Sequence, residues 1–339
     1  MARLRPRIVA LAGADLFESF FDASRRRRLG RAFDWERSAV RADGPALRAL
    51  LADADGLITT WDSPRFGPDL PDLAPHLRVI AHCGGEVKGR FARSLFSRLT
   101  ITNAPGPMAA YVAELAVAFA LHAVRRIDDY RAELRAPSNR VYLRMHLHGA
   151  PEDETLLGRT VGLVGFGRIG REVADRLAPF GPRLLVYDPF VSAAAVRRRH
   201  GEPARLEPLL AASTVVILAA ALTDATRGML DARRLGLLPD GAILVNVARG
   251  GLVDLAALTR EVRRRRLRVA LDVTDPEEPL PLRHPLRRDP GAVLTPHVGA
   301  ATVSVRRAMA DLVLSDLERV FRGERPRNRV TPRMLDRMT

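Results

Sequence analysis

Residues 160–181 decide the fold, and they read Thr160-Val-Gly-Leu-Val-Gly-Phe-Gly-Arg-Ile-Gly-Arg-Glu-Val-Ala-Asp-Arg-Leu-Ala-Pro-Phe-Gly181. The segment opens with an apolar run that is typical of a buried strand. Val173, Leu177 and Phe180 then recur at helical spacing, and Gly181 is a plausible residue to end that helix. The pattern therefore predicts a strand, a glycine-rich turn and a helix in immediate succession.

The turn contains the pattern Gly-x-Gly-x-x-Gly, formed by Gly165, Gly167 and Gly170. The first glycine allows the tight turn, and the second lets the backbone approach a pyrophosphate. The third permits close packing of the helix on the strand, while the helix N-terminus attracts the phosphate charge. A glycine-rich turn without a ligand is the alternative, but the strand and helix around the motif favour a dinucleotide site.

The next predicted strand ends in Asp188. A carboxylate at this place accepts hydrogen bonds from the ribose hydroxyls and repels a 2′-phosphate. Pro189 and Phe190 follow, so no adjacent cation would neutralise that phosphate. The sequence therefore predicts NAD rather than NADP as the cofactor.

Short apolar runs alternate with helical patterns along the rest of the chain, which indicates parallel sheets covered on both faces. Ten such runs are too many for one comfortable sheet, so we expect an α/β protein with two doubly wound domains. The predicted strands cover residues 8–12, 56–59, 78–81, 100–103, 160–165, 183–188, 214–218, 242–247, 268–273 and 293–296. The predicted helices cover residues 45–53, 109–125, 169–180, 231–237 and 254–265. Residues 135–157 are expected to form an exposed excursion.

Composition narrows the function classes. The chain of 339 residues carries 54 Lys and Arg against 39 Asp and Glu, a net charge of +15. The arginine runs are scattered and aromatic residues make up only 5%, so we expect solvated faces and no nucleic-acid partner. Cys83 is the only cysteine, which excludes an intrachain disulfide and a multi-cysteine zinc site, and no metal is expected. The apolar residues 8–12 resemble the apolar part of a signal peptide, but the run is short and a first strand is favoured. We expect a cytoplasmic protein with no membrane partner.

Three further segments place polar groups at the carboxyl ends of predicted strands, where open α/β sheets bind ligands. They are Ile243-Leu-Val-Asn-Val-Ala-Arg-Gly-Gly-Leu-Val-Asp254, Ala270-Leu-Asp-Val-Thr-Asp-Pro-Glu-Glu-Pro279 and Leu294-Thr-Pro-His-Val-Gly-Ala-Ala-Thr302. Together with the glycine motif, these segments resemble the D-isomer-specific 2-hydroxyacid dehydrogenase family from about residue 78 to residue 322. The resemblance implies a Rossmann NAD-binding domain at 108–299 and a flavodoxin-like substrate domain at 1–107 and 300–339.

The family's catalytic triad falls on Arg249, Glu277 and His297. A guanidinium holds the carboxylate and carbonyl of a 2-oxo acid by paired hydrogen bonds. An imidazole supplies a proton donor that titrates near neutrality, and a neighbouring carboxylate orients it. Glu277 is chosen over Glu278 because it lies five positions after Asp272, the usual family spacing, although many members have proline directly after the glutamate.

Other roles are also implied by the resemblance. Gly84 and Gly85 would present backbone N–H groups to the substrate carboxylate, and Asp272 would bind the nicotinamide carboxamide. The remaining expected cofactor contacts are Arg168, Ile169, Val247, Ala248 and Gly299, with Arg249 and His297 also beside the cofactor.

The sequence departs from the family in the loop His82-Cys-Gly-Gly-Glu-Val-Lys-Gly89. Lys88, the only lysine, falls near an aspartate position of the family and is a candidate to contact the distal part of the substrate; a solvated lysine is the alternative. The resemblance implies an NAD-dependent oxidoreductase that acts on a small 2-hydroxy or 2-oxo acid of D configuration, and these departures leave the identity of that acid open. An NAD-sensing corepressor-like module and a formate-type dehydrogenase are the competing hypotheses. A homodimer packed through the helix from Ala109 and the neighbouring excursion is expected by resemblance.

Overall fold

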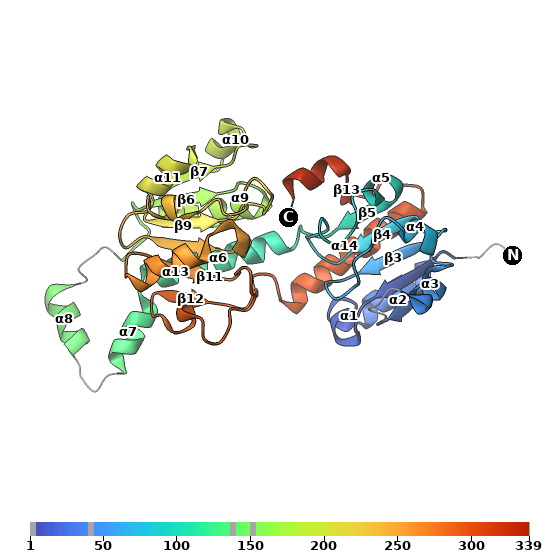
Figure 1. The fold of residues 1–339 in the computed structure, drawn as a ribbon, viewed down its shortest axis with the longest axis horizontal. Coiled ribbons are helices and arrows are strands. Elements are labelled where there is room, and N and C mark those ends of the chain that lie inside the picture. Colours follow the sequence, from blue (N-terminus) through green and yellow to red (C-terminus); the bar gives the residue numbers. More distant parts are fainter. Residues whose placement is uncertain (1–4, 40–43, 136–139, 150–153, 339) are drawn as a thin grey trace. The chain divides into compact units, whose positions relative to one another are not determined.

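A computed structural model describes residues 5–39, 44–135, 140–149 and 154–338 of the chain. The chain forms two compact units (Figure 1). Unit 1 comprises residues 1–108 and 301–339, and unit 2 comprises residues 109–300. These limits lie one residue after the domain boundaries expected from the sequence.

Unit 1 is built on a six-stranded sheet with the strand order β13-β5-β4-β3-β1-β2. All neighbouring strands are parallel except the β13–β5 pair, which is antiparallel. The strands are β1 (Arg7–Leu11), β2 (Asp34–Ser38), β3 (Gly56–Thr59), β4 (Val79–His82), β5 (Thr100–Asn103) and β13 (Arg329–Val330). Its α-helices are α1 (Ala14–Phe20), α2 (Ala23–Ala32), α3 (Pro45–Leu51), α4 (Leu70–Leu73), α5 (Leu95–Arg98) and α14 (Val303–Phe321).

Unit 2 is built on a seven-stranded parallel sheet with the order β12-β11-β10-β9-β6-β7-β8. The strands are β6 (Thr160–Val164), β7 (Arg183–Tyr187), β8 (Gly201–Pro203), β9 (Val215–Leu218), β10 (Ile243–Asn246), β11 (Arg268–Leu271) and β12 (Ala292–Leu294). The α-helices are α6 (Met108–Val124), α7 (Ile127–Leu134), α8 (Arg140–His148), α9 (Arg168–Leu177), α10 (Ala193–Arg197), α11 (Leu206–Ala212), α12 (Ala232–Leu235) and α13 (Leu255–Arg263).

The strand orders confirm the predicted fold class. In unit 1 the parallel strands follow the order 2-1-3-4-5 of flavodoxin-like sheets, and in unit 2 they follow the 3-2-1-4-5-6 order of the Rossmann fold. Strands β3, β4, β9 and β10 are buried along their whole length, as the continuous apolar runs predicted. Their carboxyl ends, and the loops that follow, are where a ligand is expected in each unit.

Three strands were not predicted from the sequence, and all three lie at the edges of the sheets. Strand β2 is polar and largely exposed, β8 has only three residues and includes a proline, and β13 has only two residues. Edge strands lack the continuous apolar pattern because one side faces away from the core. The excursion predicted at 135–157 contains helix α8, which is amphipathic and buries Val141; residues 136–139 and 150–153 of this excursion lie outside the described ranges.

Several arginines of the basic runs form ion pairs within unit 1. From α2, Arg25 pairs with Asp311 at 2.5 Å, and Arg28 makes two hydrogen bonds of 2.8 Å to the Glu318 carboxylate of α14. These contacts bind α2 to α14 and give part of the positive charge a structural role. In the part of the chain that the structure describes, no single helix is long and apolar enough to cross a membrane, although the bent pair α6 and α7 passes by length and composition.

Candidate active site

The glycine turn after β6 has the geometry that its three glycines predict. Gly165 lies at a positive φ of 95°, and a Cβ there would be 2.5 Å from the backbone nitrogen of Ala220. A Cβ on Gly170 would be 2.2 Å from the carbonyl oxygen of Gly165. Both positions therefore need glycine, because the turn packs against the loop after β9 and against the first turn of α9.

Gly167 is different, because a Cβ on this residue would meet nothing within 4 Å. The residue is the N-cap of α9, and as a glycine it places no side chain in front of the helix N-terminus. A pyrophosphate fits this cradle, since backbone N–H groups and the helix dipole both favour an anion. Arg168 and Ile169 begin the helix at the same end, and their expected contact with the cofactor stays a prediction.

Asp188 follows β7 and lies against the glycine turn. Its Oδ2 accepts a hydrogen bond from the N–H of Phe166 at 2.7 Å, and its Oδ1 accepts one from the N–H of Phe190 at 2.9 Å. These two bonds fix the carboxylate beside the cradle, and each oxygen retains a free lone pair for a ribose hydroxyl. The geometry thus agrees with ribose binding.

Arg249 lies in the loop that follows β10. Asn246 shapes this loop: its side-chain amide donates to the carbonyl of Arg249 (2.9 Å), and its Oδ1 accepts from the N–H of Ala248 (3.0 Å). Val247 and Ala248 are buried, whereas Arg249 is half-buried and donates from Nη1 to the carbonyl of Ala248 at 2.7 Å. The loop therefore anchors the arginine backbone and leaves a charged side chain at the carboxyl end of the sheet.

The loop after β11 passes directly over the Arg249 loop. A Cβ on Gly250 would be 2.1 Å from the carbonyl carbon of Thr274 and 2.4 Å from the nitrogen of Asp275. Gly250 therefore permits the close approach of two backbones, which brings the predicted arginine segment next to the predicted glutamate segment. The hydroxyl of Thr274 donates to the carbonyl of Glu277 at 2.6 Å and closes the turn that leads to the two glutamates.

Asp272 ends β11 and is buried, with 2% of its surface exposed. Its Oδ1 accepts hydrogen bonds from the Thr295 hydroxyl (2.5 Å) and the Val298 N–H (2.8 Å), and its Oδ2 accepts one from the Gly299 N–H (2.9 Å). All three donors belong to the loop that carries His297. Asp272 thus anchors that loop, a role that the sequence did not reveal; its expected contact with the nicotinamide carboxamide stays a prediction.

His297 faces Glu278, at 3.2 Å between Nδ1 and Oε1. The prediction that Glu277 is the partner is wrong for this structure: among the described residues the Glu277 side chain pairs with no cation, and its carbonyl oxygen accepts from the Thr274 hydroxyl. The family spacing from Asp272 was misleading, because the segment carries one more residue before Pro279. The useful signal was the Glu278-Pro279 dipeptide, in which the glutamate directly precedes the proline.

Gly84 and Gly85 follow β4 in unit 1. The carbonyl of Gly84 accepts from the N–H of Ala104 (2.9 Å), and that of Gly85 accepts from the Asn103 side chain (2.7 Å). Within the described residues, neither glycine N–H has an acceptor. Two paired carbonyls and two unpaired N–H groups make the loop suited to a carboxylate, as the resemblance implied. Lys88 is exposed nearby, in the turn that follows.

Two supporting residues were missed at the sequence level. Asn246 and Thr295 bond to the loops of Arg249 and His297 rather than standing where a ligand would bind, so a motif search for charged groups passes over them. Both lie directly at the end of a strand, within a segment already singled out for its catalytic residue. Position at a strand end was therefore the one available signal.

The comparisons agree with this geometry. The family described as D-isomer specific 2-hydroxyacid dehydrogenase, NAD binding domain, matches residues 117–299. The chain is 34% identical to D-3-phosphoglycerate dehydrogenase of Mycobacterium leprae over 293 residues, which cover 83% of this chain and 52% of that protein. It is also 34% identical to glyoxylate reductase of Pyrococcus furiosus over 285 residues, or 81% of this chain and 82% of that one.

A similar solved structure is the NADPH-dependent glyoxylate/hydroxypyruvate reductase of Sinorhizobium meliloti in complex with NADP and malonate, with a TM-score of 0.74 and 27% identity over 98% of each chain. The chain spans about half the length of the phosphoglycerate dehydrogenases but most of the reductases that it matches. On the fold, the site and these relatives, the chain belongs to the D-isomer-specific 2-hydroxyacid dehydrogenase family, enzymes that transfer a hydride between NAD(P) and a 2-hydroxy or 2-oxo acid.

Proposed function

We propose that the chain reduces a small 2-oxo acid with NADH to the D-2-hydroxy acid, with His297 as the general acid. The contact of 3.2 Å between His297 Nδ1 and Glu278 Oε1 carries this proposal, because a carboxylate at that nitrogen orients the imidazole and stabilises its protonated form. Nδ1 is thereby occupied, so Nε2 is the nitrogen that meets the substrate oxygen. The bound nicotinamide supplies the hydride.

Arg249 is proposed to bind the substrate carboxylate and to polarise its carbonyl. Its planar guanidinium offers five N–H donors, of which Nη1 already donates to the carbonyl of Ala248. This internal bond orients the guanidinium, and the charge favours the oxygen on which negative charge develops during reduction. His297 then donates its proton to that oxygen, and the reverse reaction uses the same imidazole as the base.

The N–H groups of Gly84 and Gly85 are proposed to bind the substrate carboxylate. Their lack of acceptors among the described residues supports this assignment. For the cofactor, the fixed carboxylate of Asp188 supports NADH over NADPH, since a 2′-phosphate would meet a negative charge held by two backbone N–H groups.

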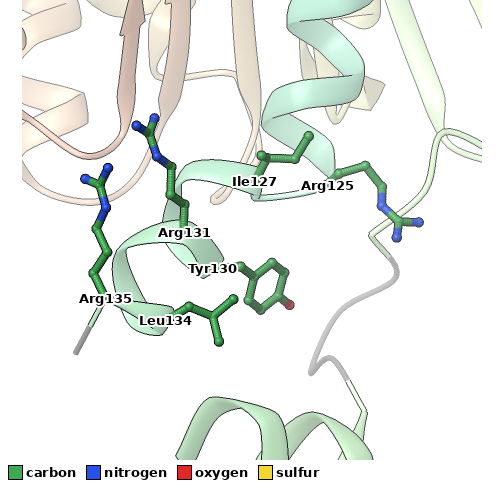
Figure 2. A pocket seen from close by; sticks show the side chains of 6 residues that line it. All are labelled: Arg125, Ile127, Tyr130, Arg131, Leu134 and Arg135. Atoms are coloured by element: carbon green, nitrogen blue, oxygen red, sulfur yellow. The ribbon is translucent and has the colours of Figure 1, made fainter. Parts of the chain in front are cut away.

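A homodimer is proposed through α7 and α8. Helix α6, expected to share in this interface, is largely core, with residues such as Val112, Ala116 and Phe119 buried. The two following helices instead expose five large apolar side chains to 49–73%, which is unusual for a free surface; they are Ile127, Leu134, Tyr142, Leu143 and Leu147. Figure 2 shows Ile127, Tyr130 and Leu134 lining a hollow on α7, flanked by Arg125, Arg131 and Arg135.

Reduction of a panel of 2-oxo acids, followed by the loss of NADH absorbance, tests the catalytic proposal. His297→Asn should retain NADH binding and lower kcat by about 10²–10⁴, the usual range for a lost acid or base. Equal turnover by the variant would remove His297 from the role of general acid.

Light scattering tests the dimer: the wild-type chain should have the mass of two copies, and Leu143→Asp with Leu147→Asp should reduce it to one.

A further inference from the structure

Arg306 lies near the start of α14 in unit 1, in an aromatic setting. Its guanidinium carbon is 5.4 Å from the ring centre of Trp61 and 5.9 Å from that of Phe20. The two rings are themselves 5.2 Å apart, and Arg306 Nη1 donates to the hydroxyl of Ser19 at 3.0 Å. The guanidinium is therefore held in one place by two rings and one hydroxyl.

This guanidinium has no acidic partner among the described residues. Its Nε is buried and bonds to nothing in the described part of the chain. Its neighbour Arg307 behaves differently, because it lies 3.6 Å from the carboxylate of Asp22. Cation–π contacts offset part of the cost of burying a cation, but they leave its net charge uncompensated. Arg306 thus presents a fixed positive charge that an anion would neutralise.

The same cluster adjoins the loop proposed to bind the substrate carboxylate. A Cβ on Gly84 would be 3.0 Å from the indole Nε1 of Trp61 and 2.3 Å from Nε2 of His82. The indole therefore packs against the backbone of Gly84, while Arg306 lies on the indole ring. Trp61, Gly84 and Arg306 all belong to unit 1, so their neighbourhood is independent of how the two units are arranged.

We propose that Arg306 and Trp61 form a subsite for a second anionic group on the substrate, so that the preferred substrate is a 2-oxo acid with a distal carboxylate or phosphate. This inference rests on the proposed function, which places the first carboxylate at Gly84 and Gly85. Trp61 forms the wall between the two anionic groups, and Arg306 neutralises the distal one. The sequence suggested Lys88 for a distal contact, but Lys88 is exposed. Its charge lies near the carboxyl of Asp336, and Arg93, with a smaller effect of Lys88, lowers the pKa of that carboxyl.

Steady-state kinetics with matched substrates test the proposal. Oxaloacetate and 2-oxoglutarate carry a distal carboxylate, 3-phosphohydroxypyruvate carries a distal phosphate, and glyoxylate and pyruvate carry neither. We expect the wild-type kcat/KM to be at least 10-fold higher for one of the dianionic classes than for pyruvate, and the preferred class identifies the group. Arg306→Met should lower that value by about 10–100-fold, the range for a lost charged hydrogen bond, and change the glyoxylate value less than 3-fold. Arg306→Lys should recover part of the loss.

Arg307→Met is the control, because it removes an adjacent arginine that is already paired, and it should leave the substrate ranking unchanged. A uniform loss on all substrates in Arg306→Met, or a wild-type preference for pyruvate, would overturn the inference.

A binding readout separates this inference from the proposed function. In a Trp35→Phe background, Trp61 is the only tryptophan, so its fluorescence should change when the preferred dianion is titrated without turnover. Arg306→Met should weaken this binding at least 10-fold. Binding without reduction would sustain the anionic subsite and overturn the catalytic proposal, whereas reduction of glyoxylate with no fluorescence response to any dianion would do the reverse.

Discussion

The main-chain carbonyl of Asp272 accepts a hydrogen bond from the N–H of His297 at 2.9 Å, while its carboxylate accepts three more from the surrounding loop. His297 itself lies at a φ of 56°, in the left-handed region that non-glycine residues rarely adopt. Such a conformation persists only where neighbouring contacts impose it. We infer that the buried aspartate holds the proposed general acid in its strained position.

Thr295→Val tests this anchoring without touching a group proposed to meet the substrate. The change removes the 2.5 Å bond to the Asp272 carboxylate and leaves that oxygen with one donor fewer. We expect kcat to fall about 5–30-fold, as for a loss of 1–2 kcal/mol, with KM for the 2-oxo acid nearly unchanged. Thr295→Ser keeps the hydroxyl and should restore kcat. A variant in which only KM changes would argue against a role in positioning His297.

Glu278→Gln should slow reduction, whereas Glu277→Gln should not. Glu278 lies 3.2 Å from His297 Nδ1, so its carboxylate orients the imidazole that donates the proton. Without this charged partner, we expect kcat for the 2-oxo acid to fall about 10–100-fold, the range for a lost charged hydrogen bond, with NADH binding unchanged. Glu277 engages Thr274 through its main chain, which makes its glutamine variant the matched control. A loss of kcat in the Glu277 variant alone would return the role to that residue.

The sequence located each segment of this site but could not resolve the position of the glutamate within its loop. Arg249 and His297 each lie three residues beyond the end of a strand, in short loops after β10 and β12, so the strand ends determine where they lie. Glu277 instead closes a turn with Thr274 and Glu278 follows that turn, so a rule based on spacing from Asp272 cannot detect one added residue there. Long-range contacts such as Asp272 with Thr295 depend on β11 and β12 lying side by side, which no local pattern reveals.

Asp188→Ala should narrow the preference for NADH over NADPH. Removing the carboxylate abolishes the repulsion of a 2′-phosphate, but it also removes the acceptor for the ribose hydroxyls and for the N–H of Phe166. We therefore expect NADH to bind about 10-fold more weakly and NADPH to bind equally or more tightly, as measured by titration calorimetry. Equal affinities of the wild-type chain for both cofactors would contradict the assignment of Asp188.

The fold was more predictable than the surface features. Central strands such as β3 and β5 were located to the residue because every side chain in the run is apolar or packed. Edge strands and helix α7 were not, since these exposed segments bury too little apolar surface to give a clear pattern. The anionic subsite at Arg306 was equally hidden, because it depends on α1, α14 and the loop after β3 meeting in space.

His82 ends β4 directly before the loop of Gly84 and Gly85. Burial, with a smaller effect of Arg90, lowers the pKa of His82 from 6.5 to about 3, so the imidazole is neutral in the folded chain at pH 7. Its Nδ1 lies 3.0 Å from the Thr59 hydroxyl, and Nε2 lies beneath Gly84.

Because the folded-state pKa of His82 lies below the unfolded one, protonation favours unfolding, and stability present above pH 6.5 is lost as the pH falls toward 3. Through this histidine, the free energy of unfolding at pH 4.5 should be about 2–3 kcal/mol lower than at pH 7. Urea unfolding of the wild type and of His82→Asn measures the effect, because only the wild type should carry it. Parallel losses in both proteins would show that His82 does not titrate on unfolding.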